Sequence, residues 1–193
     1  RIVILSKRPA TIKEIVEIYR AAVNKVRGGE AGYDKKMWQP MPALNLPGAA
    51  AVDNVLKLVA ERYITPEADA ETLHSETGTD EAKSRMPAFV LTDLSKVKSA
   101  SCMMNGNNYS LQLVFAEERT PASKETCVLG QVTDLLFTRT EIDRELANLP
   151  VLSDPDYDLI YNSFTVTAEI TPAGEFVSLH HHADVDILIN SVN

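Results

Sequence analysis

The chain is poor in the residues that mark small disulfide-bonded proteins and membrane proteins. Only 2 of its 193 residues are cysteine, 8 are glycine, and aromatic residues make up 6%. Cys102 and Cys127 are too far apart in sequence for the C-x-x-C spacing of a zinc or redox motif. We interpret them either as two semi-buried thiols or as a disulfide of an exported protein. No apolar run approaches the ~20 residues of a transmembrane helix.

Positive charge is also scarce. The chain has 19 Lys and Arg residues against 27 Asp and Glu residues, which gives a formal net charge of −8. The electrostatic field of this net negative charge repels a phosphate backbone, and no basic stripe is present, so we expect no nucleic-acid partner. The same field disfavours an anionic membrane surface. The hydrophobic content of 45% is typical of a globular domain, and a chain of this length buries roughly 70% of its unfolded surface.

Catalytic and nucleotide-binding motifs are missing as well. The sequence contains no G-x-S-x-G, P-loop, Rossmann glycine fingerprint or H-E-x-x-H segment. The acidic stretch 66–87 lacks the spacing of a calcium loop, and we interpret it as a surface loop. Asp154, Asp156 and Asp158 alternate in a segment that is typical of a turn leading into a strand. An enzyme is therefore the less favoured interpretation, and a hydrolase with an unrecognised site is the third hypothesis.

The N-terminal part predicts two helices. Residues 11–27 place apolar side chains at i, i+3, i+4 and i+7, with a capping box formed by Thr11 and Glu14 and a stop at Gly28-Gly29. A proline-rich connector, "MWQPMPALNLPG", follows, in which we expect Trp38 to pack against the core or to line a ligand groove. A second helix is predicted from about Gly48 to Tyr63.

The apolar pattern changes to a period of two in the second half of the chain. "VKSASCMM" and "YSLQLVFAEE" flank an Asn-Gly turn and predict a hairpin with Cys102 on its core face. "VLGQVTDLLFT" predicts a further strand, and "TRTEIDRELANLP" predicts a short helix capped by Thr140. "LIYNSFTVTAEI" and "EFVSLHHHADVDILI" flank "TPAG" and predict a second hairpin, in which His181 lies opposite Phe164.

Together these elements predict a single α+β domain over residues 1–193. An antiparallel β-sheet of about four to six strands carries the N-terminal helices on one face, because neither helix buries its apolar stripe alone. The helical part spans about 11–63, the acidic loop about 66–87 and the sheet-rich part about 88–193.

Three of the 4 histidines are adjacent in the second hairpin. Side chains alternate across a strand, so His180, His182 and Asp184 share one face and His181 lies on the other. The Cα atoms of His180 and His182 are then about 7 Å apart, which suits a pair of metal ligands. Zinc needs a third and usually a fourth ligand, and Asp184 is the candidate for the third. The alternative is a solvent-facing strand, with no cofactor unless zinc or copper binds there.

Several segments of the chain occur in a familiar order. "TIKEIVEIYRAAVNKVR" precedes a Gly-Tyr-Asp-Lys segment, "LSKVKSASCMMNGNNYSLQLVF" and "ITPAGEFVSLHHHADVDI". This order resembles that of uncharacterised exported, lipoprotein-like proteins of Gram-positive gut bacteria. The similarity spans most of the chain and rests on hydrophobic pattern and turn residues. It implies an extracellular or cell-surface location, with membrane attachment only through a lipid anchor on a precursor, and it implies no catalytic residues.

From these observations we predict a non-enzymatic exported domain that binds a ligand or partner protein, or that assembles with itself. The partner is an unidentified protein, a small ligand or a second copy of the chain in a homo-oligomer. The alternative function is metal binding by the H-x-H pair of His180 and His182.

Overall fold

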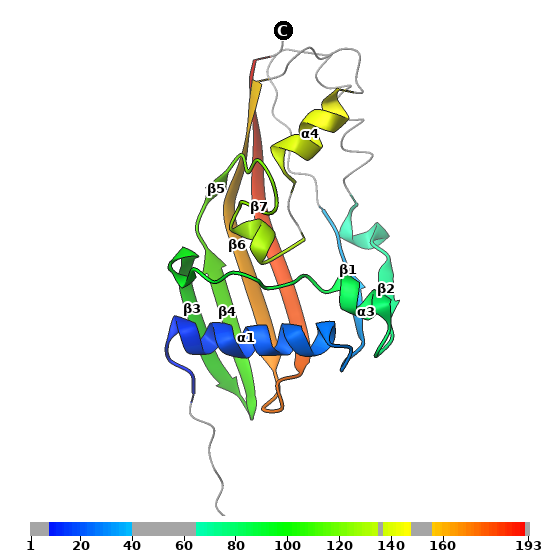
Figure 1. Cartoon of the computed structure of the whole chain (residues 1–193), viewed down its shortest axis with the longest axis vertical. Helices are drawn as coiled ribbons and strands as arrows, with labels where there is room; N and C mark the ends of the chain where they lie inside the picture. Colours follow the sequence, from blue (N-terminus) through cyan, green and yellow to red (C-terminus); the bar gives the residue numbers. More distant parts are fainter. Residues whose placement is uncertain (1–7, 40–64, 135–136, 148–155, 192–193) are drawn as a thin grey trace, which may run out of the picture.

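An antiparallel sheet of 5 strands and the long helix α1 (Ile12–Arg27) form the centre of the molecule (Figure 1). The computed structural model describes residues 8–39, 65–134, 137–147 and 156–191. The strands of the sheet are β3 (Val97–Asn105), β4 (Asn108–Phe115), β5 (Glu118–Arg119), β6 (Asp156–Ile170) and β7 (Phe176–Ser191). The fold belongs to the α+β class that the sequence predicts.

Strand β6 is the centre of this sheet. β4 and the short β5 pair with one edge of β6, β7 pairs with the other edge, and β3 pairs with β4. All of these pairs are antiparallel, as expected for hairpins with short turns. Within the part of the chain that the structure describes, β3, β7 and the short β5 are therefore the edge strands.

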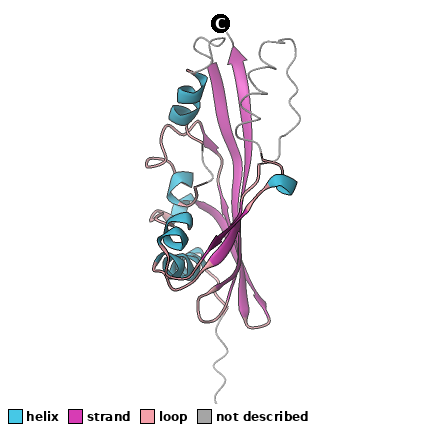
Figure 2. Cartoon of the chain, turned by 90° about the vertical axis from the view of Figure 1, so that its right-hand side faces the viewer, coloured by secondary structure: helices cyan, strands magenta, loops and turns pink. Residues whose placement is uncertain are grey.

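The smaller elements surround this centre. β1 (Tyr33–Lys36) and β2 (Thr72–Ser75) form a separate antiparallel ribbon beside helix α3 (Asp80–Arg85) (Figure 1). Helix α4 (Arg139–Leu146) and 3-10 turns at Glu67–Asp69, Leu94–Lys96 and Leu129–Gln131 complete the described elements. Helices α1, α3 and α4 gather on one side of the five-stranded sheet, as the side view in Figure 2 shows.

Helix α1 forms as the sequence predicts. The Glu14 N–H donates to Thr11 Oγ1 at 3.2 Å, and the Thr11 N–H donates to Glu14 Oε2 at 3.0 Å, so the capping box is confirmed. Gly29, just beyond the helix, has a φ of 85°, which glycine adopts without the steric penalty of a side chain. One face of the helix is buried, and its buried residues are Ile15, Val16, Tyr19, Ala22, Val23 and Val26.

The core lies between α1 and the face of the sheet that it covers, which we call the inner face. Cys102 and Cys127 are both buried in this core as free thiols, so they do not form the disulfide that was the alternative interpretation. Fully enclosed side chains from the sheet include Leu111, Leu113, Phe115, Phe164, Val166 and Ile170. Burial of this apolar surface is what holds the helix against the sheet.

The first hairpin is confirmed, including its core face. Cys102 lies opposite Leu111, and Ala100 lies opposite Leu113. The turn contains Gly106, whose φ is 60°, at its first central position. A glycine with positive φ at this position matches the right-handed twist of the two strands.

The second hairpin has the predicted strands but a different register. His181 lies opposite Val166, and Ala183 rather than His181 lies opposite Phe164. The turn is one residue longer than predicted: the Thr171 N–H donates to the carbonyl of Glu175 at 2.9 Å, and a register shift follows. From Ser163 to Glu169 the total displacement is two residues, so the side chains of this part of β6 keep their predicted faces. A further shift between Tyr161 and Ser163 reduces the displacement to one residue, so the β6 side chains before Ser163 exchange faces and Leu159 and Tyr161 join the core.

Three other local predictions are wrong. "VLGQVTDLLFT" contains the 3-10 turn Leu129–Gln131 and no strand among its described residues. Helix α4 is capped by Thr138, whose Oγ1 accepts the Glu141 N–H at 3.4 Å, while Thr140 donates to a loop carbonyl. The stretch 66–87 is more than a surface loop, since it holds a 3-10 turn, β2 and α3. The predicted helix from Gly48 to Tyr63 lies outside the described residues.

Candidate functional site

His181 lies on the inner face of β7 and connects three parts of the fold. Its Nε2 is 2.8 Å from Tyr19 Oη on α1, and its Nδ1 is 3.2 Å from Thr133 Oγ1 in the segment after the Leu129–Gln131 turn. The rings of His181 and Phe164 pack in a T-shaped arrangement, with centroids 5.5 Å apart and an angle of 82° between their planes. A neutral imidazole donates through one nitrogen and accepts through the other, so it satisfies both hydroxyl groups.

The electrostatic surroundings keep His181 neutral at pH 7. Burial lowers its pKa to about 4, from an ordinary value of 6.5, because the charged form loses its hydration. Asp134 opposes this shift, while Lys35 and His180 add to it. Burial also raises the pKa of Tyr19, so that its hydroxyl stays protonated. His181 is thus a structural hydrogen-bond bridge, as its predicted place on the core-side face implies.

The opposite face of the sheet, which we call the outer face, carries a group of side chains that we call the outer patch. It is the region where β3, β4, β6 and β7 run side by side, and the register aligns its members in rows across the sheet. None of its members is buried. They are Ser99, Ser101 and Met103 on β3, Ser110, Gln112 and Val114 on β4, Thr165, Thr167 and Glu169 on β6, and Ser178, His180 and His182 on β7.

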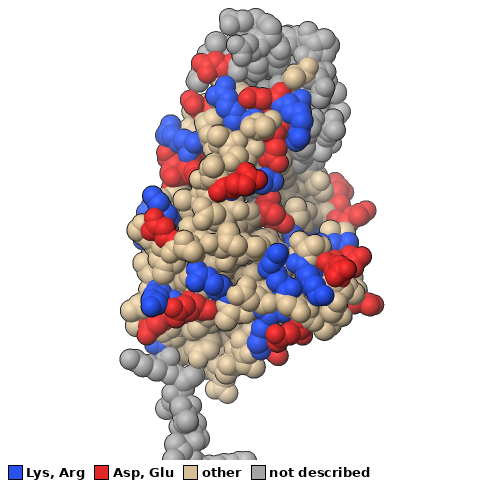
Figure 3. Space-filling model, viewed as in Figure 1, with Lys and Arg blue, Asp and Glu red and all other residues tan. Residues whose placement is uncertain are grey.

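The outer patch is polar but nearly free of charge. Half of its side chains carry a hydroxyl group, and none is Lys or Arg. Glu169 is its one acidic residue, and the Oε1 of Glu169 accepts a hydrogen bond of 2.7 Å from Asn108 Nδ2. Charged residues make up 24% of the chain, and on the helix-covered side basic and acidic side chains are interspersed over the surface (Figure 3). The outer patch therefore differs from the helix-covered side in its lack of charge.

The rings of Trp38, His180 and His182 form a row along the β7 side of the outer patch. We call these three side chains the ring row. The imidazoles of His180 and His182 are stacked, with centroids 6.4 Å apart and planes 13° from parallel. The indole of Trp38, from the segment after β1, lies 6.0 Å from the His180 ring. Both histidines are exposed, and Trp38 is partly buried. The structure thus places Trp38 beside the predicted H-x-H pair, although the two lie far apart in the sequence.

The predicted metal ligands lie on this same edge. His180 and His182 face outward together, and Asp184, which is also exposed, follows opposite Ser163. Their cross-strand neighbours are Thr and Ser residues, which are weak zinc ligands. In the described ranges of the chain, no three His, Cys, Asp or Glu side chains are arranged to hold a metal ion. The structure brings the two imidazoles together, but none of the residues it describes is a third strong ligand beside them.

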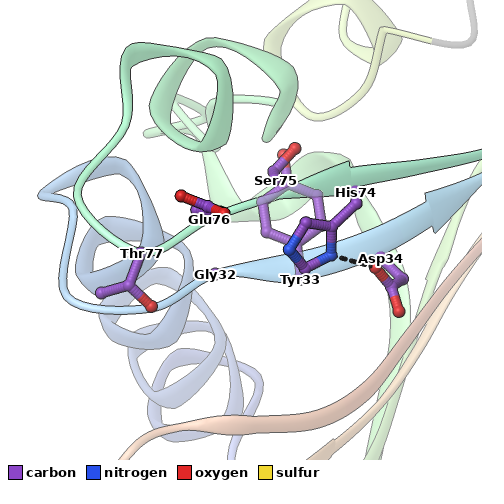
Figure 4. Close-up of a pocket in the computed structure, with 7 residues that line it drawn as sticks. All are labelled: Gly32, Tyr33, Asp34, His74, Ser75, Glu76 and Thr77. Atoms are coloured by element: carbon purple, nitrogen blue, oxygen red, sulfur yellow. Dashed lines mark hydrogen bonds and ion pairs between the residues drawn. The ribbon is translucent and has the colours of Figure 1, made fainter.

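A second candidate is a surface depression of about 390 Å³ on the β1–β2 ribbon (Figure 4). Asp34 lies opposite His74 across the ribbon, and His74 Nδ1 donates to Asp34 Oδ1 at 2.7 Å. Gly32 lines the depression where the two chain segments approach closely: a Cβ there would be 2.5 Å from the carbonyl oxygen of Ser75. The arrangement places an acid–histidine pair in an open hollow.

The Asp34–His74 pair does not form a catalytic triad with the neighbouring serine. Ser75 points to the side of the ribbon opposite His74 (Figure 4), where it is buried and accepts a hydrogen bond of 3.1 Å from Arg85. The side chains of His74 and Asp34 are 69% and 65% exposed, so water screens their interaction. The geometry supplies neither an aligned nucleophile nor a desolvated acid–base pair, both of which nucleophilic catalysis requires.

Sequence reasoning missed both the outer patch and the Asp34–His74 contact. A signal for the patch was present, because Ser99, Ser101 and Met103 alternate with core residues along one strand. What the sequence did not reveal was which strands are neighbours, and therefore that these alternate positions join into one surface. The Asp34–His74 contact depends on the pairing of β1 with β2, which a long segment separates in the chain.

Comparisons with known proteins add no assignment. No helix in the described parts of the chain is long and apolar enough to cross a membrane. No protein-family model matches the chain, and comparisons with curated proteins and with solved structures find no match. The function must therefore be argued from the residues of the chain itself.

Proposed function

We propose that the protein is a non-enzymatic exported domain that binds a partner or ligand, and that the outer patch is its binding surface. The observation that carries this proposal is the near absence of charge on the outer patch, an exposed part of the sheet face, in a chain that is 24% charged. Depletion of charged residues is a compositional mark of the centre of binding interfaces.

The identity of the residues on the outer patch supports a role beyond solubility. Edge strands that face water are ordinarily protected by charged side chains, Lys above all, which prevent unwanted pairing. Neither the outer positions of β3 nor those of β7 within the patch carry such a charge. Serine contributes little packing and no charge, yet it recurs at Ser99, Ser101, Ser110 and Ser178. A surface that binds another molecule through hydrogen bonds accounts for this choice.

A matched pair of charge insertions tests the proposed surface. Thr167 is exposed in the middle of the patch, and Thr72 is an exposed threonine on β2, outside the patch. The probes are a neutral polysaccharide, an anionic polysaccharide, anionic vesicles and the protein itself, the last by sedimentation velocity over a wide concentration range. We expect at least one interaction that Thr167→Lys abolishes and Thr72→Lys leaves unchanged, with equal melting temperatures. If no probe binds, or if the two variants behave alike with every probe, the proposed surface is wrong.

Export is the second part of the proposal, and it rests on the resemblance to exported, lipoprotein-like proteins. Fractionation of the native cells, with the protein located by a specific antibody, tests it. We expect the protein in the extracellular or cell-surface fraction. Recovery in the cytosolic fraction alone would contradict export while leaving the binding surface untouched.

Metal binding is the second candidate function. The stacked, exposed imidazoles of His180 and His182 favour it, because two neighbouring histidines on one strand face are the starting point of a zinc or copper site. Titration calorimetry of untagged protein with zinc and with copper tests it, with His182→Ala and His74→Ala as test and control variants. Binding that His182→Ala abolishes supports a metal site, and the absence of binding to the native chain rules this function out.

A further inference from the structure

We infer that the outer patch and the ring row bind a neutral, polyhydroxylated ligand: an uncharged polysaccharide strand that lies across the face of the sheet. This inference rests on the proposed function and names the chemical class of its ligand. It commits to a neutral glycan and excludes a nucleic acid, an acidic polymer and a second copy of the chain as the occupant.

The hydrogen-bonding groups of the patch match those of a sugar. Each Ser or Thr hydroxyl both donates and accepts, and the Gln112 amide does the same through its two ends. Gln112 lies between Ser101 and Thr167 in one row across the sheet, and all three are exposed. Such a row offers alternating donors and acceptors to ligand hydroxyl groups and has no formal charge to demand a counter-ion.

The ring row supplies the apolar contact that sugar recognition also needs. A pyranose ring has one face of C–H groups, which packs against aromatic rings and imidazoles. The Trp38 and His180 rings are 6.0 Å apart, and the His180 and His182 rings are 6.4 Å apart, so they line one side of the patch at closely similar intervals. Rings therefore flank a hydroxyl-rich floor, with strands about 4.8 Å apart.

The same chemistry argues against the other occupants. A sheet-on-sheet dimer gains its stability from apolar burial, and the central row of the patch, from Ser101 to His180, contains no aliphatic side chain. An anionic polymer would meet a protein with a net charge of −8 and a patch without Lys or Arg. A neutral polysaccharide is not repelled by the net charge, and it binds through hydrogen bonds rather than through apolar burial.

The shape of the patch makes a further distinction. A flat sheet face buries less of a monosaccharide than a closed pocket does, so each sugar unit gains little free energy by itself. Several rows of equivalent groups, however, contact successive units of one chain and add their contributions. We therefore expect measurable binding to a polymer and much weaker binding to the free monosaccharide.

Affinity electrophoresis in native gels tests the inference. The probes are starch, galactomannan and mixed-linkage β-glucan as neutral polymers, and polygalacturonate as the anionic polymer. We expect retardation in at least one neutral gel and none in polygalacturonate. Thr167→Lys should weaken the neutral interaction at least tenfold, and Thr167→Ala and His180→Ala should weaken it less severely. Thr72→Lys is the control with the same change of charge, and the melting temperature of each variant shows that it is folded.

The outcomes separate the ligand class from the surface. Retardation in a neutral gel that the Thr167 and His180 variants reduce supports the inference. Binding only to polygalacturonate, or only self-association, that is lost in Thr167→Lys overturns the glycan assignment and leaves the proposed surface standing. Neutral-glycan binding that every patch variant retains overturns the inference and the proposed surface together.

Discussion

Acidification should destabilise the fold through His181. Its pKa in the folded state is about 4, whereas the unfolded chain has the ordinary value of 6.5. Between pH 6.5 and pH 4, His181 binds a proton in the unfolded chain but stays neutral in the folded chain. The contribution of neutral His181 to stability is therefore complete above pH 6.5 and is lost as pH falls from there toward 4.

The size of this effect follows from the two pKa values. Each unit of difference corresponds to about 1.4 kcal/mol, so linkage gives a loss of about 2.5 kcal/mol in the free energy of unfolding between pH 7.5 and pH 4.5. That is a large fraction of the roughly 5–15 kcal/mol that stabilises a typical domain. The physical cause is the cost of placing a charge between Tyr19, Thr133 and Phe164.

Urea denaturation across this pH range measures the effect. Carboxylates also titrate there, so the comparison is between the native chain and His181→Gln, with His182→Gln as the control because His182 is exposed on the same strand. The native chain and the control should lose about 2.5 kcal/mol more than His181→Gln does between pH 7.5 and pH 4.5. Parallel curves for all three proteins would refute the reasoning, as would an NMR titration of His181 with a midpoint near 6.5.

Three further predictions address the rest of the fold. Thr11→Ala removes the capping hydroxyl of α1 and should lower the free energy of unfolding by about 1 kcal/mol in urea denaturation, whereas Thr11→Ser should preserve it. Gly32→Ala places a Cβ 2.5 Å from the carbonyl oxygen of Ser75, so amide hydrogen exchange in the β1–β2 ribbon should accelerate; unchanged exchange contradicts the close approach. Cys102 and Cys127 are buried thiols whose pKa values are raised by burial, so a thiol reagent should modify them slowly in the native protein and rapidly in urea. Fast native modification would contradict their burial.

The parts of the fold that the sequence predicts well are those governed by local rules. Helix α1 has a 3.6-residue apolar period and a capping box, and both hairpins have apolar alternation with glycine in the turn. The predicted inner and outer faces of β7 also hold, and those of β6 hold from Ser163 to Glu169, because the register error there is an even number of residues. An error of one residue would have exchanged the two faces and placed the His180–His182 pair in the core.

The failures have a common physical origin in tertiary context. "VLGQVTDLLFT" has the composition of a strand, but Gly130 packs against the backbone of Lys124, where any Cβ would clash, and the segment turns instead. β1, with the sequence "YDKK", has no apolar alternation, and it forms because it pairs with β2. Propensity is a weak prior in such segments, and the contacts that override it lie far away in the chain.

The candidate site shows the same limit from the functional side. Alternation along β7 is enough to separate His181 from His180 and His182, but Tyr19 is 162 residues away from its hydrogen-bond partner His181. The contact between Tyr19 and His181 also fixes which side chains of β7 lie on the outer face. Sliding β7 by one residue would break both hydrogen bonds of His181 and turn His180 or His182 into the core. The inner histidine therefore holds the register in which the outer pair and the hydroxyl rows face water, and the binding surface depends on a residue that is not part of it.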